Sequence, residues 1–457
     1  MKINSIALAS MLATGLWLTS CTGKLDIKPV TNVSAGQALS TASDLNALLV
    51  GAYDAIGNVN VYGGDLQRDA ELLGDNGEVT WTGTFAAPQQ MYTKRLLINN
   101  DQIDVTWTNA YRAINIANTV LANLSLAASA DRNRIEGEAK FIRASMYFEL
   151  VRVYAKSWGD GDNNANLGVP IVLTPTTSID ASNNVARSTV AAVYTQVIQD
   201  LVDAESKLPA TNGFFATKGA AAAQASRVYL QKLDYTNAAA AANRVIAGGQ
   251  YELVPIEQVF DLRTNVSGGN TNETIFAIQI TDQDGTNDLN TFYGASEYGG
   301  RGDIEINDKH LALYDANDNR GALFYQDEIG AVRTAKFINQ YGNIQILRLA
   351  EMYLTRAEAN FRAGTTVGVT PLADINTVRA RAGATALTSA QLTAAAILKE
   401  RRLELAFEGT LLHDVKRTRQ SIVAGTTTVA WNSTRLIYPI PLREITTNPA
   451  LLQNAGY

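Results

Sequence analysis

A pair of alanine-rich helical patterns constrains the fold of this chain more than any other feature. Residues 220–233 and 235–247 repeat apolar side chains at helical spacing, and only Asp234 separates them. Alanine fills most positions at which the two helices would touch, and small side chains allow a close approach. Two glycines follow the second segment, which is typical of a helix end. The sequence therefore predicts packed antiparallel helical hairpins.

Further segments repeat apolar residues with the same period, and non-helical inserts separate them. Alanine-rich pairs of this length resemble tetratricopeptide units, although their spacing along the chain is irregular. The inserts lack a helical period, and the middle one includes a strand-like stretch at residues 274–278. We expect an all-α fold, a tetratricopeptide-like scaffold of helical pairs with long loop-rich inserts and a few short strands. The further helical segments are 42–53, 105–124, 135–155, 189–208, 346–362, 372–382 and 392–409, and the inserts are 156–187, 250–345 and 420–457.

The N-terminus has the pattern of a lipoprotein signal peptide. A positive charge precedes an apolar run over residues 6–18, which is shorter than the roughly 20 apolar residues of a membrane-spanning helix. The run ends in Leu-Thr-Ser-Cys, which resembles a bacterial lipobox, and Cys21 is the only cysteine of the chain. We expect residues 1–20 to be a signal peptide and residues 21–34 a tether that carries lipid, palmitate included, on Cys21. The alternative is an ordinary signal peptide with a chance cysteine.

The composition limits the chemistry of the chain. The net charge of -6 does not favour binding to nucleic acid. One cysteine and two histidines supply few thiolate or imidazole ligands for a metal ion. We therefore expect no cofactor and no metal. Two loops, 160–166 and 282–288, alternate oxygen-bearing side chains as a calcium site would, but neither has the EF-hand glycine and glutamate, and polar turns explain both. His310 is expected in a surface loop, and His413 as a packing residue at a helix end.

Several short motifs follow one another in a fixed order along the chain. They lie at residues 137–151, 347–351, 356–359, 376–383, 400–409, 414–417 and 439–457. In this order and at these distances they closely resemble the SusD/RagB family of Bacteroidetes nutrient-binding outer-membrane lipoproteins. The resemblance covers essentially all of the chain after the signal, which implies a single SusD-like domain over 35–457. Its N-terminal part would span about 35–250 and its C-terminal SusD/RagB part about 270–457.

The resemblance implies a binding protein without catalytic activity. Family members lie outside the cell on the outer membrane, cap a TonB-dependent transporter of the SusC kind, and capture glycans or, in some members, peptides. The function expected for this chain is therefore glycan capture for import by a SusC-like partner. Two alternatives stay open: a RagB-like peptide or protein binder, and a surface glycoside hydrolase using a carboxylate pair such as Asp75 and Glu78.

Three glutamates of one motif, Glu400, Glu404 and Glu408, are spaced four apart, as on one face of a helix. Paired carboxylates are compatible with acid–base catalysis. Arginines accompany the carboxylates in each of these motifs, however. We therefore expect structural ion pairs that brace the helix against Arg348, Arg379 or Arg381.

Loop aromatics identify the candidate ligand site, because sugar faces stack on aromatic rings while amide and carboxylate groups bind the hydroxyls. Residues 55–100 are expected to form a long ordered loop, which is usually functional in a compact domain. Loop aromatics gather there and again near residues 285–301. Trp81 is predicted as the main platform, although it can instead pack the loop against the helices. The predicted ligand-binding residues are Tyr62, Asp75, Asn76, Trp81, Phe85, Tyr293 and Tyr298, with Tyr92, Asp65, Arg68, Phe292, Asn287, Asn290, Glu297 and Arg301 nearby.

Overall fold

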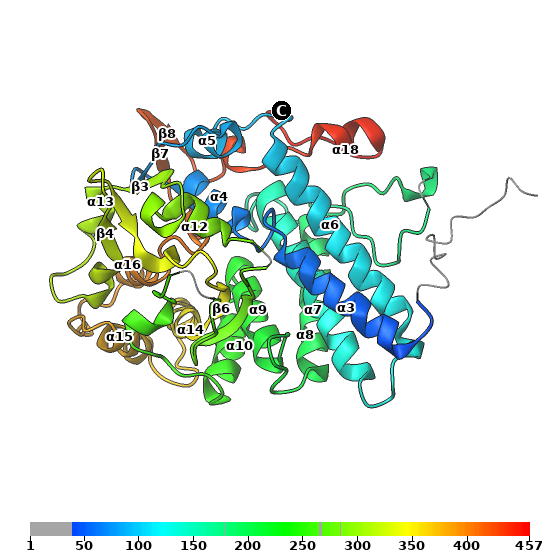
Figure 1. Cartoon of the computed structure of the whole chain (residues 1–457), viewed down its shortest axis with the longest axis horizontal. Coiled ribbons are helices and arrows are strands. Elements are labelled where there is room, and N and C mark those ends of the chain that lie inside the picture. Colours follow the sequence, from blue (N-terminus) through cyan, green and yellow to red (C-terminus); the bar gives the residue numbers. More distant parts are fainter. Residues whose placement is uncertain (1–38, 179, 265–266, 284) are drawn as a thin grey trace, which may run out of the picture.

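The computed structural model describes residues 39–178, 180–264, 267–283 and 285–457. Helices dominate it and the strands are short, which confirms the all-α prediction. Figure 1 labels the elements as they are named below. The helices are α3 Ala42–Gly57, α4 Asp65–Gly74, α5 Ala86–Thr93, α6 Asp101–Ala122, α7 Arg132–Tyr154, α8 Val190–Lys207, α9 Lys218–Gln231, α10 Tyr235–Ala247, α11 Ile256–Val259, α12 Asp288–Tyr293, α13 Asp308–Leu311, α14 Leu349–Ala363, α15 Pro371–Arg381, α16 Ala394–Glu404, α17 Leu411–Arg417 and α18 Leu442–Thr447.

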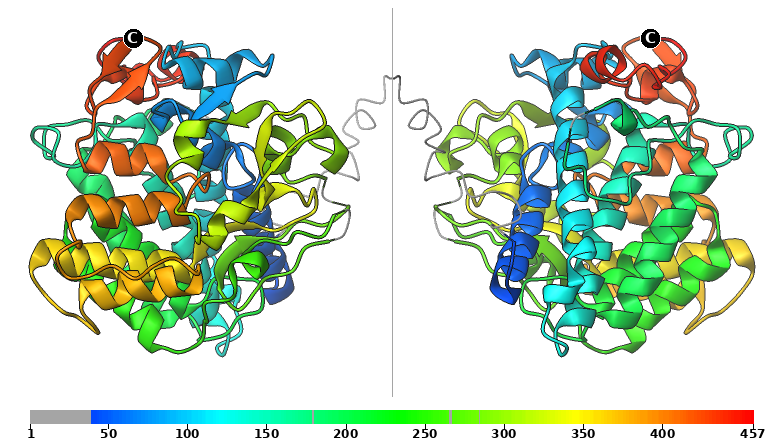
Figure 2. Two further views of the ribbon diagram at one scale, coloured as in Figure 1. Left: turned by 90° about the vertical axis from the view of Figure 1, so that its left-hand side faces the viewer. Right: turned by 90° about the vertical axis from the view of Figure 1, so that its right-hand side faces the viewer.

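The long helices form a continuous array in which each packs on its neighbours. α7 packs against α6 and α8, α9 against α8 and α10, and α10 against α14. The predicted alanine-rich hairpin is α9–α10, and its facing alanines are buried. Figure 2 shows α3 and α6 lying side by side along one flank of the array. The helical-pair scaffold is therefore confirmed.

Side-chain caps fix where several of these helices begin. Asn100, Thr189, Thr217 and Thr393 each accept a hydrogen bond from a backbone N–H in the first turn of the helix that follows. Such caps satisfy backbone donors that have no partner inside the helix, and each is worth about 1 kcal/mol.

Four two-stranded antiparallel sheets are described, and most of their strands lie in the middle insert and near the C-terminus. The first sheet pairs β1 with β3, so Val79 faces Ile306 and Trp81 faces Ile304. It joins the N-terminal loop region to the middle insert. The strands are β1 Val79–Trp81, β2 Thr274–Ile278, β3 Ile304–Ile306, β4 Phe324–Gln326, β5 Val332–Thr334, β6 Ile344–Arg348, β7 Ile422–Ala424 and β8 Thr427–Val429, paired as β1–β3, β2–β6, β4–β5 and β7–β8.

The prediction of one long loop over residues 55–100 was wrong. This segment contains α4, β1 and α5, and all ten residues of α4 are buried. α4 escaped the sequence pattern because half of its buried side chains are polar or charged, including Arg68, Asp69 and Glu71. An amphipathic period identifies a helix with one solvated face, and α4 has none.

Two other boundaries also differ from the prediction. The helix predicted over 392–409 ends at Glu404, and Phe407 and Gly409 then adopt left-handed backbone angles. The segment predicted as helix from residue 346 begins as strand β6 and becomes helical at Leu349. Glu408 therefore lies beyond the helix that carries Glu400.

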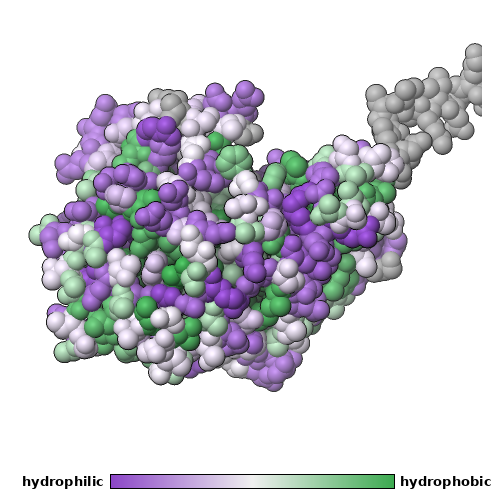
Figure 3. Space-filling view, turned by 90° about the horizontal axis from the view of Figure 1, so that it is seen from below, coloured by the Kyte–Doolittle hydropathy of each residue, from purple (hydrophilic) through white to green (hydrophobic). Residues whose placement is uncertain are grey.

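The predicted signal peptide 1–20, Cys21 and the tether 21–34 lie outside the described residues. Within the described ranges, no helix is long and apolar enough to cross a membrane. The face in Figure 3 intermixes hydrophilic and hydrophobic side chains in small patches.

Candidate ligand-binding surface

The structure buries several side chains that were predicted to face a ligand. Tyr62, Asp75, Trp81 and Tyr293 all lie in the interior, and Trp81 is only 7% exposed. A sugar cannot stack on a ring that is covered by protein. The expectation that these side chains are exposed was therefore wrong. It assumed a long surface loop, whereas α4 and β1 place much of this segment in the core.

Each of these buried side chains has protein partners. The Tyr62 hydroxyl donates a hydrogen bond to Glu149, 3.0 Å away. The Tyr293 ring packs against Phe337 and Phe407, with ring centroids 5.4 and 5.6 Å away. Burial raises the pKa of Tyr293 well above its ordinary value. These residues hold the loop-rich part of the molecule together.

The two predicted groups of loop aromatics meet in space. The β1–β3 ladder brings residues 79–81 beside residues 304–306. Trp81 and Phe292 then lie 5.9 Å apart, and Phe85 meets Phe292 edge to face at 6.1 Å. Phe292 also lies under the guanidinium group of Arg68, 4.2 Å from its ring centroid. The sequence separated these residues by more than 200 positions, and the fold unites them.

Phe85 is the large aromatic residue that this assembly leaves open to solvent. It is 48% exposed and lies at the start of α5. The Arg301 guanidinium sits 4.6 Å from the ring centroid on one side. Arg301 also donates to Asp303 at 2.9 Å and to the Thr84 hydroxyl at 3.5 Å. We call Thr82, Thr84, Phe85, Arg301 and Asp303 the Phe85 surface.

Packing keeps the Phe85 surface rigid. Arg68, whose guanidinium lies over the Phe292 ring, forms ion pairs with Asp65 at 2.5 Å and Asp69 at 2.7 Å. These charges raise the pKa of Arg68 even though burial alone lowers it. A ring held by a buried, charge-paired frame loses little conformational freedom on binding a ligand.

The remaining predicted residues lie at different places. Tyr298 is half-buried and meets Tyr325 edge to face at 5.2 Å. Its loop is fixed because the Tyr325 hydroxyl accepts the Ala295 N–H at 3.0 Å. Asn76 is half-buried and accepts the N–H of Val423 at 2.9 Å, so it anchors β7. Of the seven predicted residues, Phe85 is the one that the structure leaves as an exposed platform.

Comparison with known proteins identifies the family. One family model, described as starch-binding associating with outer membrane, matches residues 25–230, and a second, described as the SusD family, matches residues 333–457. The chain belongs to the SusD/RagB family. SusD-like protein P2 of Formosa agariphila is 26% identical over 88% of this chain and 89% of its own length.

Solved structures of SusD proteins share the whole fold. A putative sugar binding protein from Bacteroides vulgatus is 26% identical, with a TM-score of 0.82 over 92% of this chain and 99% of that one. A SusD superfamily protein from Bacteroides thetaiotaomicron is also 26% identical, with a TM-score of 0.80 over 91% of this chain and all of that one. SusD-like proteins are carbohydrate-binding proteins of the outer-membrane surface, and this is the class to which the chain is assigned.

The SusD/RagB motif carboxylates form the buried ion-pair network that was predicted. Arg348 pairs with Glu404 at 2.6 Å and with Glu408 at 2.6 Å. Arg381 pairs with Glu404, and Arg379 pairs with Glu400 at 2.7 Å. Although burial opposes ionisation, the guanidinium groups hold the pKa of Glu404 well below its usual range. These glutamates brace the SusD fold.

The two carboxylates considered for hydrolysis are also engaged in the structure. Asp75 accepts the backbone N–H groups of Gly77, Glu78 and Val79. Glu78 accepts from Arg402 at 2.8 Å and lies 2.6 Å from the imidazole of His310. A glycosidase needs one carboxyl free to protonate the leaving group and another to face the sugar. Both side chains serve local structure instead.

The acidic loop at 160–166 is a polar turn. The Asp162 carboxylate accepts the N–H of Asn164 at 2.9 Å, and the Asn166 amide donates to the Asp160 carbonyl at 2.7 Å. In the second loop, Asp284 lies outside the described residues. No group of three or more His, Cys, Asp or Glu side chains is placed to hold a metal ion in the described part of the chain.

The prediction that His310 lies in a surface loop was wrong. It belongs to α13, its side chain is fully buried, and its second ring nitrogen lies 3.2 Å from the Tyr314 hydroxyl. Burial lowers the pKa of His310 to about 4, although Glu78 opposes that shift. His413 is buried in α17, where it packs as expected.

His310 gives the fold a measurable pH dependence. The unfolded histidine titrates near about 6.5, whereas His310 titrates at about 4 in the fold. As the pH falls from about 6.5 to 4, the histidine of the unfolded chain therefore takes up a proton while His310 of the folded chain stays largely neutral. Protonation favours the unfolded state, and the free energy of unfolding decreases. We expect the stability advantage of the wild type over His310→Asn to shrink between pH 7 and pH 4.5, measured by urea denaturation. Glu78 stays charged throughout, since its pKa is about 2. An advantage that is constant with pH would contradict this assignment.

One exposed aromatic pair was missed by the sequence analysis. Phe214 and Phe215 lie between α8 and α9, and Phe214 is 63% exposed. The signal in the sequence is two adjacent aromatics in a short polar connection that begins at Pro209.

Proposed function

We propose that the chain is a cell-surface lipoprotein that captures oligosaccharides or polysaccharides on the Phe85 surface, for import by a TonB-dependent SusC-like transporter. Membership of a carbohydrate-binding outer-membrane family supports the ligand class. The observation that carries the location is the exposed ring of Phe85, held on a rigid frame built from both predicted aromatic groups. We propose no catalytic role for it.

The chemistry of the Phe85 surface suits a sugar. An exposed aromatic ring offers a flat apolar face to the C–H groups of a pyranose. Arg301 supplies N–H donors and Thr84 supplies an acceptor for hydroxyl groups, while Asp303 holds Arg301 in place. Each of these contacts is weak. A polysaccharide repeats its sugar units many times, and this repetition raises its overall affinity for the surface.

The membrane anchor is proposed from the N-terminal pattern. Cleavage after residue 20 would leave Cys21 to carry lipid, palmitate included, with residues 21–34 as the tether. A single acyl chain binds a bilayer only weakly, and stable anchoring requires more than one. The domain of residues 35–457 would then face the outside of the cell, and its N-terminal part (about 35–250) and C-terminal part (about 270–457) would act as one SusD-like unit.

A RagB-like peptide or protein binder is the second candidate. It is favoured by the helical-pair scaffold, because such arrays bind extended segments on their surfaces. A peptide would be held mainly through backbone hydrogen bonds and alternate side-chain pockets. The Phe85 surface, a single open ring with charged neighbours, fits a sugar better. No cofactor is part of the proposal.

A glycan array and a peptide library, both probed with the soluble domain from residue 35 onward, separate these functions. We expect binding to one class of glycan and no selective peptide. Reducing-sugar release from the bound glycan should stay at the level of the buffer. Selective peptide binding with an empty glycan array would contradict the proposal, and sugar release would establish a hydrolase.

A further inference from the structure

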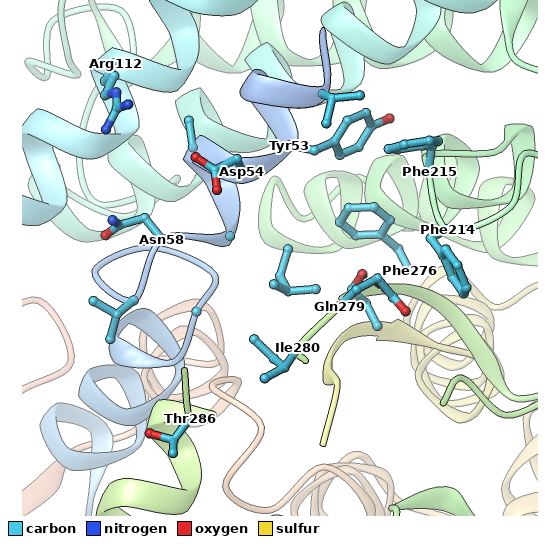
Figure 4. A pocket seen from close by; sticks show the side chains of 17 residues that line it. Tyr53, Asp54, Asn58, Arg112, Phe214, Phe215, Phe276, Gln279, Ile280 and Thr286 are labelled. Carbon is cyan, nitrogen blue, oxygen red and sulfur yellow. Dashed lines mark hydrogen bonds between the residues drawn. The ribbon is translucent and has the colours of Figure 1, made fainter. Parts of the chain in front are cut away.

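A large cavity of the described structure lies apart from every residue of the Phe85 surface. It has a volume of about 540 Å³ and is bounded by α3, the connection between α8 and α9, and strand β2 with the residues that follow it. This volume falls within the roughly 300–1,000 Å³ of ordinary small-molecule sites. We call it the Phe214 groove, and Figure 4 shows its lining.

One wall of the Phe214 groove is aromatic. Phe215 packs on Tyr53 with ring centroids 4.8 Å apart, and Tyr53 lies 6.4 Å from Phe276. Phe276 in turn meets Phe141 of the core at 5.1 Å. Phe214 projects beyond this stack and is 63% exposed, while Phe215 is 36% exposed. A ligand that covers these rings would gain about 25 cal/mol per Å² of apolar surface removed from water.

Hydrogen bonds fix the connection that carries these rings. The Tyr53 hydroxyl accepts the Ala216 N–H at 3.0 Å, and Asn212 donates its amide to the Ala216 carbonyl at 3.0 Å. The Lys218 N–H donates to Pro209 at 2.9 Å, which closes the connection at its base. The aromatic wall is therefore held in place before a ligand arrives.

The opposite wall is polar and charged. Asp54 on α3 and Arg112 on α6 are both exposed. Neither side chain forms an ion pair or a hydrogen bond with any part of the chain that the structure describes. Asn58 and Thr286 add an amide and a hydroxyl. Figure 4 shows Arg112, Asp54 and Asn58 across the cavity from Phe214, Phe215 and Phe276. The wall offers both donors and acceptors, with one charge of each sign.

We propose that the Phe214 groove is a second sugar-binding site, which takes a short stretch of an uncharged glycan chain. The inference rests on the proposed function for its ligand class. The phenylalanines would stack on the sugar faces, while Asp54 and Arg112 would bind hydroxyl groups on the other side. The opposite charges of Asp54 and Arg112 offset each other, so this wall gives no net preference for an anionic or a cationic ligand. Tyr53 would act as a positioning residue through its bond to Ala216.

The variants that test the groove are matched to a control. Phe214→Ala/Phe215→Ala removes the aromatic wall, and Arg112→Gln changes the opposite wall in case the first variant disturbs folding. Phe85→Ala removes the platform of the first site. Phe361→Ala is the control, because Phe361 is 36% exposed, as Phe215 is, but lies on α14. Thermal melts verify that each variant folds.

Affinity electrophoresis through gels containing soluble starch, xylan or laminarin gives the readout, followed by calorimetric titration with oligosaccharides of the retained glycan. We expect Phe214→Ala/Phe215→Ala to weaken retention about tenfold, and the wild type to bind two oligosaccharides where this variant binds one. Arg112→Gln should weaken the same site. Tyr53→Phe should weaken it too and should lower the melting temperature slightly, because the buried Ala216 N–H loses its acceptor. Phe361→Ala should match the wild type.

The outcomes separate the two proposals. If Phe85→Ala loses retention while both groove variants match Phe361→Ala, the groove is not a sugar site, although the proposed function stands. If only the groove variants lose retention, the groove is confirmed and the Phe85 surface is not the site. If the wild type is retained by none of the glycans, both proposals are overturned.

Discussion

Replacing Arg348 with alanine is expected to lower the free energy of unfolding by about 3–5 kcal/mol. Arg348 is fully buried and forms ion pairs with Glu273, Glu404 and Glu408, at distances of 2.6 to 2.8 Å. Its removal leaves carboxylates in the core without their main counter-charge, and a buried charge without a partner is far more costly than a lost surface pair. The fall should appear as a lower midpoint of urea denaturation.

Arg263→Ala is the matched control for this experiment. Arg263 also pairs with an aspartate, Asp261, but its side chain is 68% exposed. Exposed pairs contribute little because water screens them, so the midpoint should equal that of the wild type. Adding Glu404→Gln to Arg348→Ala should recover part of the lost free energy of unfolding, since it removes one of the buried carboxylates left without a counter-charge. A wild-type midpoint for Arg348→Ala would contradict the bracing role.

The scaffold could be predicted from the sequence because its helices follow a simple rule. Each of four helices, α3, α6, α8 and α10, buries one apolar stripe and exposes its other face. Apolar residues that recur about every 3.6 positions therefore identify these helices in the sequence. The motif glutamates were predicted as structural for a similar reason. A buried carboxylate needs a cation, and arginines occur in these motifs beside the glutamates. The partners come from other motifs, since Glu404 pairs with Arg348 and Glu400 with Arg379.

α4 and the ligand site could not be predicted in the same way. The buried polar residues of α4 satisfy one another through long-range contacts, such as Glu71 with Arg402 at 2.7 Å, that no local pattern reveals. Trp81 and Phe85 are both aromatics of the same segment, yet Trp81 is covered and Phe85 is open. Which ring is covered depends on the pairing of β1 with β3, more than 200 residues away in the sequence.

Replacing Phe85 with alanine is expected to have the largest effect on binding of any single change to the Phe85 surface. The ring is about half exposed in the free protein and would be covered by the bound sugar. Fully covering a phenylalanine side chain contributes about 1.5–3 kcal/mol, so covering the exposed half contributes about 0.7–1.5 kcal/mol, which corresponds to roughly 3- to 10-fold in Kd. The fold should be unaffected, because the truncation opens no cavity in the core.

Glycan binding on the Phe85 surface is tested by calorimetric titration of the wild type, Phe85→Ala and Phe361→Ala with an oligosaccharide of the retained glycan. We expect a saturable wild-type isotherm, a Kd raised roughly 3- to 10-fold at this site in Phe85→Ala, and no change in Phe361→Ala. All three proteins should melt at the same temperature. An unchanged isotherm for Phe85→Ala, at an unchanged melting temperature, would contradict the claim that this chain holds glycans on the Phe85 surface.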